Sequence, residues 1–481
     1  MPNYKDTKHS RVFELFEELS KIPRGSGNRA AIAAFCADFA KKHSLRYVVD
    51  DAKNAIIYKP ASRGYENAEP VILQGHLDMV CQKTAENPID FLTDGIELVR
   101  EGDTLHANGT TLGADNGIAV AMVLSILERD DLPHPPLEAV FTADEEIGML
   151  GAVELDTSLL SAKRLINLDS EEDDTVTVSC AGGSDFKSFV SLKRQSAISG
   201  VVKISLGGLK GGHSGVEIAS HRVNAATLSG RLLSYLAGEA EFDLVSVNSG
   251  TKANAIPCAA EIVLATAQPQ ELAALARKYL DEIRAEIAHK EPGFTAEITE
   301  EAKAECLTID KEVTKHLVYA LTCTPCGVME MSAEIEGLVE TSLNLGILST
   351  DGDEAMLCYA LRSNKASALA ALEQKMKTFY SLLDVTVSTS GHYPPWEFKK
   401  DSALTSLYRE TYRELMGTDP KVEAIHAGLE CAVFSSAIPG VDCIAIGPNV
   451  YDAHTVKERL SIASAEKTYD LLLELLKRLA A

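Results

Sequence analysis

Metal-binding residue types recur in this sequence where a predicted strand ends or a predicted helix begins. Five segments carry them: His76 and Asp78 in QGHLDMV, Asp115 in LGADNG, Glu145 and Glu146 in TADEEIG, Asp169 in NLDSEE, and His454 in DAHTVKE. Any one of them alone has an ordinary explanation, since a strand-end Asp often caps a helix. Five such sites in one chain indicate a metal centre, because imidazole and carboxylate are ligands that catalytic zinc accepts.

Coordination chemistry assigns roles to five of these residues. Two ions about 3.5–4 Å apart need a carboxylate that bridges them. A short Asp at a helix entry suits that role, which points to Asp115. We expect His76 and Asp169 to complete one metal site, and Glu146 and His454 to complete the other. Zinc, cobalt and manganese all suit such ligands.

The two remaining carboxylates are predicted to act beside the metals. Asp78 follows His76 by two residues, so it cannot easily reach the same ion and is better placed to orient the imidazole. Adjacent side chains of an extended backbone point in different directions. Glu146 can therefore bind metal while Glu145 faces the attacking water, and Glu145 is the predicted general base.

The elements that must position these residues alternate between strands and helices. Apolar runs predict buried strands that lead into loops, at 71–80, 137–148, 164–170 and 442–449. Helical periodicity predicts helices at about 28–43, 117–130 and 463–481. The alternation predicts an α/β fold with a mainly parallel sheet covered by helices. Ligands of such sheets bind beyond the carboxyl ends of the strands.

A second, inserted domain is predicted from the change of pattern between residues 187 and 396. Strands there are more amphipathic and long amphipathic helices follow them. We therefore expect a catalytic domain made of 1–186 and 397–481, with an α+β lid at 187–396. Within the lid a strand-then-helix plan occurs twice, at 254–283 and 351–379, which indicates an internal duplication.

Composition restricts the class of protein. The 481 residues carry a net charge of −24, which disfavours nucleic acid and anionic membrane surfaces as partners. The ten cysteines show no small disulfide framework. The sequence contains neither an apolar signal core at its start nor a run of eighteen apolar residues. We therefore expect a cytoplasmic protein.

The order H-x-D, D, E-E, D, H resembles that of the dinuclear zinc peptidases that include carboxypeptidase G and aminoacylase. The likeness extends along nearly the whole chain. The following motifs resemble those of the branch that cleaves aminoacyl-histidines: QGHLDMV, TLGADNGIAVA, FTADEEIGM, LINLDSEE, GGLKGGHSGVEI, ANAIP, HAGLECA and DAHTVKERL. The resemblance implies two zinc ions, a lid, and dipeptide substrates that include Xaa-His and β-alanyl-histidine. It gives the metal-site residues the same roles as the coordination argument does.

The resemblance also implies substrate-binding residues in the lid. His213 of GGHSG and Asn254 of ANAIP match positions that surround the substrate carbonyl, and Arg362 of ALRS matches a residue that grips a substrate carboxylate. Arg suits that task because its planar fork donates two parallel hydrogen bonds. Gly428 of HAGLE is a weaker candidate, where a missing side chain lets backbone approach the substrate. Without the resemblance, GGHSG reads as a Gly-rich turn and Arg362 as a solvated charge.

Assembly is the point at which the sequence departs from many relatives, which have a lid of half this size and share His and Asn across a dimer. The first lid half has His213 and Asn254 but Thr266 where the second half has Arg362. The duplicated lid is therefore expected to complete the site within one chain, and a homodimer stays open.

Two alternative functions compete with a dipeptidase. A deacylase or an exopeptidase for longer peptides would share the fold and the metals. A catalytically silent peptide-binding relative would have lost Glu145 or a ligand, and this sequence has lost neither. Two other patterns are discounted: GSGNRA at 25–30 follows a predicted helix rather than the strand that a dinucleotide site needs, and the C-x-x-C pair at 323–326 cannot form a four-cysteine zinc site.

Overall fold

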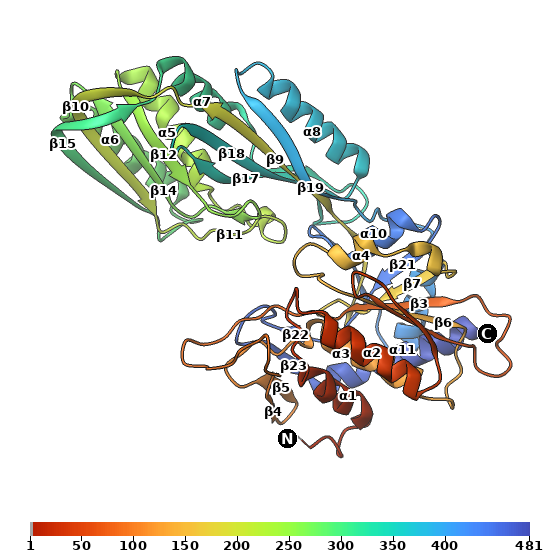
Figure 1. The fold of residues 1–481 in the computed structure, drawn as a ribbon. Helices are drawn as coiled ribbons and strands as arrows, with labels where there is room; N and C mark the ends of the chain where they lie inside the picture. The colour runs from red at the N-terminus through yellow and green to blue at the C-terminus, as the bar shows by residue number, and fades with distance from the viewer. Residues whose placement is uncertain (1–2) are drawn as a thin grey trace. The chain divides into compact units, whose positions relative to one another are not determined.

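The computed structural model describes residues 3–481, which form two compact units (Figure 1). Unit 1 contains the residues up to Cys180, Phe398–Ala424 and Leu429–Ala481, and unit 2 contains Ala181–Glu397 and Ile425–Gly428. The short segment Ile425–Gly428 belongs to unit 2 because the backbone N–H of Ala181 donates to the carbonyl oxygens of Ile425 and Ala427. No helix within residues 3–481 is long and apolar enough to cross a bilayer.

Unit 1 is built on an eight-stranded sheet. Its strands lie in the order β1 (Arg46–Val49), β2 (Ala55–Lys59), β6 (Leu137–Thr142), β3 (Val71–His76), β7 (Arg164–Asn167), β21 (Asp442–Ala445), β8 (Thr175–Cys180) and β20 (Lys421–Ile425). The four predicted strands are its parallel centre, β6-β3-β7-β21, and antiparallel strands extend it. Every residue of β3 and β6 is buried, as is typical of parallel strands covered on both faces. The predicted α/β fold is confirmed.

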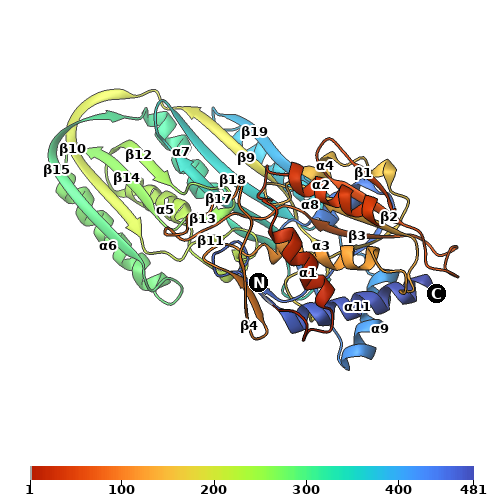
Figure 2. The same ribbon diagram turned by 60° about the horizontal axis from the view of Figure 1, so that its bottom comes forward.

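The described part of unit 1 adds these α-helices to the sheet: α1 (Ser10–Ser20), α2 (Ala30–Lys42), α3 (Ala114–Leu127), α4 (Leu150–Glu154), α9 (Ala403–Met416), α10 (Glu430–Ala437) and α11 (Ile462–Ala480). Helix α3 is apolar around its whole circumference and almost entirely buried. Helices α1 and α3 pack together, as do α9 and α11 (Figure 2). A small antiparallel sheet adds β22 (Val450–Tyr451), β23 (Arg459–Ser461), β5 (Thr104–Ala107) and β4 (Leu98–Glu101).

Unit 2 is an antiparallel sheet with helices packed together on one face (Figure 1). The strand order is β15 (Thr295–Thr308), β10 (Gln195–Gly207), β14 (Ala260–Thr266), β12 (Asp243–Ser249), β17 (Val339–Ser349), β18 (Glu354–Ser363), β9 (Gly182–Ser191) and β19 (Thr386–Tyr393), with β16 (Gly327–Met331) beside β17. The helices are α5 (Ala225–Glu239), α6 (Pro269–Ile287), α7 (Lys311–Cys323) and α8 (Ala366–Tyr380). They share one apolar core with the sheet.

The strand-then-helix repeat predicted for this region is visible in unit 2. Strand β14 leads into α6, and β18 leads into α8. A separate two-stranded ribbon pairs β11 (Gly212–His213) with β13 (Ala255–Ile256) and sets His213 opposite Ala255. Two of the predicted substrate-binding positions, His213 and Asn254, are therefore held side by side by this ribbon.

Candidate metal centre

The residues predicted as ligands converge in unit 1 around the carboxylate of Asp115. One of its oxygens lies 3.1 Å from Nε2 of His76, and the other lies 3.0 Å from Nε2 of His454. Each imidazole also contacts a second carboxylate: His76 Nε2 is 3.4 Å from Asp169, and His454 Nε2 is 3.0 Å from Glu146. The side chains thus form two groups that share Asp115, which is the arrangement that the bridging role requires.

The parallel centre of the sheet explains why these residues meet. His76 is the last residue of β3, while Glu146 and Asp169 lie in the loops that follow β6 and β7. The carboxyl ends of parallel strands lie at one edge of a sheet. Asp115 enters from the first turn of α3, and His454 from the loop after β22, where its own φ is +62°. A left-handed φ at a non-glycine residue is uncommon and concentrates at functional sites.

The loop that carries Asp115 is held by two buried charged residues that sequence reasoning missed. The carboxylate of Glu458 accepts hydrogen bonds from the backbone N–H groups of residues 112–115. The guanidinium of Arg24 donates to the carbonyl oxygens of Leu77, Asp78 and Gly113. Asp115 and Asn116, near the start of α3, have non-helical backbone angles, so the regular helix begins at Gly117, where the sequence predicted it. Glu458 thus satisfies backbone N–H groups of the segment that leads into the helix. Glu458 lies in the quoted motif DAHTVKERL, but its burial is not visible there.

Asp78 connects the imidazole of His76 to the turn that carries the two glutamates. Its Oδ1 is 3.5 Å from Nδ1 of His76 and accepts the backbone N–H of Glu145 at 2.9 Å. Its Oδ2 accepts from Ser26 Oγ at 2.7 Å and from the N–H of Glu146 at 3.3 Å. Burial alone would raise the pKa of Asp78, but the hydrogen bonds, that of His76 foremost, hold it below its usual value. The placement suits a residue that orients His76.

Crowding of negative charge dominates the electrostatics of this cluster. Burial, reinforced by Asp169 and other nearby acids, raises the pKa of Glu145 well above its usual value. Burial, with Asp115 and Glu146 nearby, raises the pKa of Asp169 to about 6. Hydrogen bonds to Asp115 and Glu146 raise the pKa of His454 to about 11. The carboxylates therefore stabilise positive charge beside them.

The donor set fits divalent metal ions. Nitrogen and carboxylate oxygen atoms of His76, Asp115 and Glu146 all lie within 4.8 Å of one another. Oε1 of Glu146 is buried and makes no hydrogen bond to any part of residues 3–481, although a buried carboxylate oxygen normally has a partner. Catalytic metal ions are bound by imidazole nitrogen and carboxylate oxygen. This cluster offers two imidazoles, several carboxylates and one carboxylate oxygen with no hydrogen bond to the described residues.

In unit 2, His213 is prepared to donate a hydrogen bond. Its Nδ1 accepts the backbone N–H groups of Gly215 and Val216, so a neutral ring carries its proton on Nε2. Burial and then the charge of Arg362 lower the pKa of His213, which favours the neutral ring. Glu217 accepts the backbone N–H of His213 and pairs with Arg222, which fixes the loop.

Arg362 lies next to His213. It is buried, its Nη1 donates to Tyr393 Oη at 2.8 Å, and its Nε has no partner among the described residues. A Cβ built on Gly215 would lie 3.0 Å from Cε1 of His213 and 3.3 Å from Cζ of Arg362, so Gly215 allows both side chains to approach. Asn254 is exposed, with its carbonyl oxygen accepting from the N–H of Ser214.

Sequence reasoning also missed His426 and Tyr393 in this cluster. His426 is buried, with Nε2 at 2.7 Å from Ser342 Oγ and Nδ1 at 3.2 Å from Asn364 Oδ1. Burial and the nearby charge of Arg362 lower its pKa to about 3. His426 stands two residues before the predicted Gly428, within the quoted motif HAGLECA. The motif was therefore the available signal, although nothing in it singles out this histidine.

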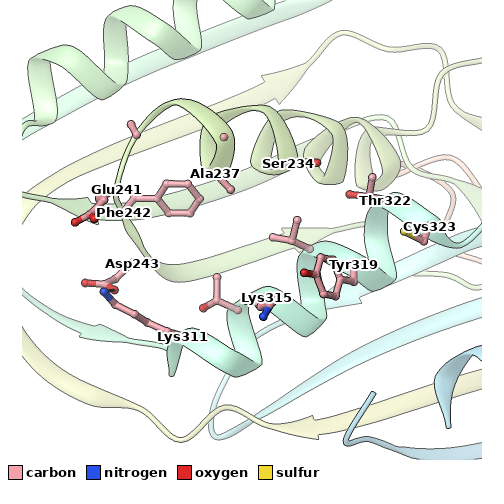
Figure 3. Close-up of a pocket in the computed structure, with 14 residues that line it drawn as sticks. Ser234, Ala237, Glu241, Phe242, Asp243, Lys311, Lys315, Tyr319, Thr322 and Cys323 are labelled. Atoms are coloured by element: carbon pink, nitrogen blue, oxygen red, sulfur yellow. Dashed lines mark ion pairs between the residues drawn. The ribbon is translucent and has the colours of Figure 1, made fainter. Parts of the chain in front are cut away.

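A cavity of about 630 Å³ lies elsewhere in unit 2, between α5 and α7. Figure 3 shows Ala237 on one helix facing Lys315 and Tyr319 on the other. None of the predicted site residues lines it, among those that the structure describes. The candidate site is therefore identified by the convergence of its donor atoms and not by cavity volume.

Comparisons of the sequence and of the structure with known proteins point to the same family. The model of peptidase family M20/M25/M40 matches residues 72–478. The cytosol non-specific dipeptidase of Escherichia coli is 36% identical over 474 residues, which is 98% of each chain. The structure of aminoacylhistidine dipeptidase from Vibrio alginolyticus matches with a TM-score of 0.90 at 33% identity, over 99% of this chain and 98% of that one.

Aminopeptidase PepT from Bacillus cereus, at 15% identity and a TM-score of 0.57, shares the fold alone. The match of the family model over most of the chain, together with a relative 36% identical along almost its whole length, settles the family. The chain belongs to peptidase family M20/M25/M40, a family of metal-dependent peptidases.

Proposed function

We propose that this chain is a dipeptidase that uses two divalent metal ions to hydrolyse the peptide bond of unblocked dipeptides, including Xaa-His and β-Ala-His. The observation that carries the proposal is the position of Asp115 between His76 and His454, with one carboxylate oxygen toward each imidazole. The names of the E. coli and Vibrio relatives support the substrate class.

The ligand roles follow from the two groups of side chains. His76 and Asp169 would hold one ion, Glu146 and His454 would hold the other, and Asp115 would contribute to both. Zinc is the metal we propose, and cobalt or manganese would suit the same oxygen and nitrogen donors. When bound, the ions polarise the scissile carbonyl and acidify the attacking water.

Glu145 is the proposed general base. Its backbone N–H is fixed by Asp78 and its carboxyl group lies among other acids, which together with burial raise its pKa. A base whose pKa lies nearer to neutral pH exchanges protons more readily in both directions. Glu145 accepts the proton of the attacking water and then donates it to the leaving amine, while Asp78 keeps the His76 ring in its orientation.

Substrate recognition is proposed for unit 2. The Nε2–H of His213 donates to the oxygen of the scissile carbonyl, where negative charge develops during the reaction. The guanidinium of Arg362, steadied by Tyr393, pairs with the C-terminal carboxylate. Asn254 and Gly428 complete the binding residues. On this proposal, 1–186 and 397–481 form the catalytic domain and 187–396 form the lid.

The cellular setting is part of the same proposal. Within the described residues all ten cysteines are thiols, as is usual in a reducing compartment. Together with the word cytosol in the name of the E. coli relative, this supports a cytoplasmic dipeptidase that acts on small peptides. Each chain is proposed to hold a complete site, whether or not it forms a homodimer.

A substrate panel tests the proposal against the alternative hydrolases. Purified protein loaded with each divalent metal is assayed on Ala-His, β-Ala-His, N-acetyl amino acids and a tripeptide. We expect cleavage of the unblocked dipeptides and little turnover of the others. Preference for N-acetyl amino acids would indicate a deacylase, preference for the tripeptide a longer-peptide exopeptidase, and no turnover with any metal would leave a peptide-binding relative.

A further inference from the structure

A layer of four polar side chains lies inside the parallel centre of unit 1, in strands that are largely apolar. They are Gln74 of β3, Thr142 of β6, Asn167 of β7 and Glu430, the first residue of α10, and each has 0% of its surface exposed. Polar groups with no access to water are costly unless they are hydrogen-bonded. Four of them together, three of which stand just before the loops of the proposed ligands, indicate a purpose beyond core packing.

Glu430 is the acceptor that joins this layer. Its Oε2 accepts from Gln74 Nε2 at 2.5 Å and from Thr142 Oγ1 at 2.7 Å. Gln74 Oε1 in turn accepts from Asn167 Nδ2 at 2.6 Å, across the β3–β7 pair in which these two residues are register partners. One carboxylate from a different element therefore ties together the carboxyl ends of three adjacent strands.

Each strand that Glu430 reaches leads directly to a residue of the proposed metal centre. His76 follows Gln74 by two residues and is the register partner of Thr142. Glu145 follows Thr142 by three residues. Asp169 follows Asn167 by two, and its backbone N–H donates to Asn167 Oδ1 at 3.3 Å. The spacing between His76 and Asp169 thus depends on the same network that Glu430 anchors.

We propose that Glu430 is a positioning residue for the metal centre: by accepting from Gln74 and Thr142 it fixes the ends of β3, β6 and β7, and so the spacing of His76, Glu145 and Asp169. The inference rests on the proposed function, since it assumes that these residues serve a metal centre. Glu430 is not among the proposed ligands or substrate-binding residues, and it acts through the hydrogen bonds that it accepts. Outer residues that orient ligands typically change metal affinity or activity by about 10–100-fold when removed.

Glu430→Gln is a conservative variant that separates the hydrogen bonds of Glu430 from its negative charge. Both hydrogen bonds fall on one oxygen, Oε2, while Oε1 is buried with no partner in the described chain. An amide oxygen can accept the same two bonds, so Glu430→Gln should keep the network and Glu430→Ala should lose it. A requirement for negative charge, in contrast, would make both variants defective.

A matched control lies at the opposite end of β6. Glu138 is also a buried carboxylate, and it accepts hydrogen bonds from the N–H and Oγ of Ser161 and from the N–H of Ala162. Glu138→Ala removes a comparable set of buried bonds from the same strand without reaching the ligand-bearing loops. It measures the general cost of such a loss to the fold.

The experiment compares wild type with these three variants by Zn²⁺ affinity in chelator competition, by kcat and KM on a dipeptide, by the absorption spectrum of the Co²⁺-loaded protein and by thermal unfolding without metal. For Glu430→Ala we expect affinity to fall about 10–100-fold, the Co²⁺ spectrum to change, and kcat to fall with little change in KM. Glu430→Gln should stay within about threefold of wild type in affinity, because its bonds are retained. Glu138→Ala should lose thermal stability alone.

Two results would overturn the inference. One is a Glu430→Ala protein with the Zn²⁺ affinity and Co²⁺ spectrum of wild type, and the other is a Glu430→Gln protein as defective as Glu430→Ala. If Glu430→Ala does not fold, Thr142→Val removes one of the two donors, and we expect affinity to fall about threefold to tenfold; unchanged affinity would overturn the inference too. Failure of the proposed function is distinguishable, because wild type itself would then bind no Zn²⁺.

Discussion

The metal centre of unit 1 and the His213–Arg362 cluster of unit 2 place histidines in opposite electrical surroundings. In unit 1, hydrogen bonds to Asp115 and Glu146 raise the pKa of His454 to about 11. In unit 2, burial and the charge of Arg362 lower the pKa of His213, and the same causes lower that of His426 to about 3. One cluster stabilises added positive charge, and the other keeps its imidazoles neutral beside a guanidinium.

This difference indicates the kind of ligand that each cluster can bind. Cations stabilise carboxylates that are gathered around two imidazoles, and Oε1 of Glu146, which has no hydrogen-bond partner within residues 3–481, is free to bind one. A neutral imidazole with an Nε2–H donor, next to a buried guanidinium whose Nε has no partner in the described chain, suits a carbonyl oxygen and a carboxylate. On the proposed function, the same residue types would serve metal binding in one unit and substrate binding in the other.

The largest effect is expected within the first cluster, from Glu145→Gln. The amide keeps the shape of the side chain but cannot accept the proton, and general-base catalysis contributes roughly 10²–10⁴-fold. We therefore expect kcat to fall by at least that factor while the metal content of the protein stays unchanged. Steady-state kinetics and metal analysis of the same preparation measure both quantities.

The adjacent Glu146→Gln is the control for this assignment. Glu146 contacts His454 at 3.0 Å, so this variant should lose metal as well as activity. If the two phenotypes are exchanged, with Glu145→Gln losing metal and Glu146→Gln retaining it, the assignment of base and ligand is reversed.

A smaller loss is expected in the second cluster, from Arg362→Ala. Leaving a substrate carboxylate without its buried partner costs about 2–5 kcal/mol in kcat/KM. The loss should shrink sharply for a dipeptide amide, which has no carboxylate to leave unpaired. Kinetics on the matched acid and amide measure the difference.

His213→Ala provides the contrast to Arg362→Ala, because it should lower kcat more than it raises KM. Its hydrogen bond strengthens only as charge develops on the carbonyl oxygen. An Arg362→Ala variant that loses equal activity on the acid and on the amide would exclude a carboxylate-binding role for this arginine.

Asp78→Ala should reduce activity less than Arg362→Ala or His213→Ala does. Asp78 contacts His76 and the backbone of both glutamates without a predicted bond to metal. Loss of such a residue typically reduces metal affinity or activity by about 10–100-fold. Metal titration measures it, and complete loss of one ion from a crystal of this variant would instead make Asp78 a direct ligand.

The smallest change in activity is expected when the Arg362→Ala and His213→Ala variants are mixed. Because both lid halves belong to one chain, Arg362→Ala and His213→Ala subunits should not restore each other under conditions that allow subunit exchange. An activity assay of the mixture, with wild type carried through the same treatment, measures this. Recovered activity would mean that chains share a site.

The strands, and the group of side chains that converges around Asp115, were predictable because their signals are local. Apolar runs mark β3 and β6, and a His or Glu stands where each run ends. Arg24, Glu458 and Glu430 were not predictable, since their roles depend on burial among residues far apart in the chain, such as the contact of Glu458 with residues 112–115. The assignment of Ile425–Gly428 to unit 2 depends in the same way on the distant N–H of Ala181.

Metal reconstitution tests the central claim most directly. Protein stripped by a chelator is titrated with Zn²⁺ while hydrolysis of Ala-His and the amount of bound metal are followed together. The two groups of ligands around Asp115 predict an inactive stripped protein and full activity at two equivalents of metal per chain. Turnover by the stripped protein, or activity that saturates at one equivalent, would contradict the two-metal account.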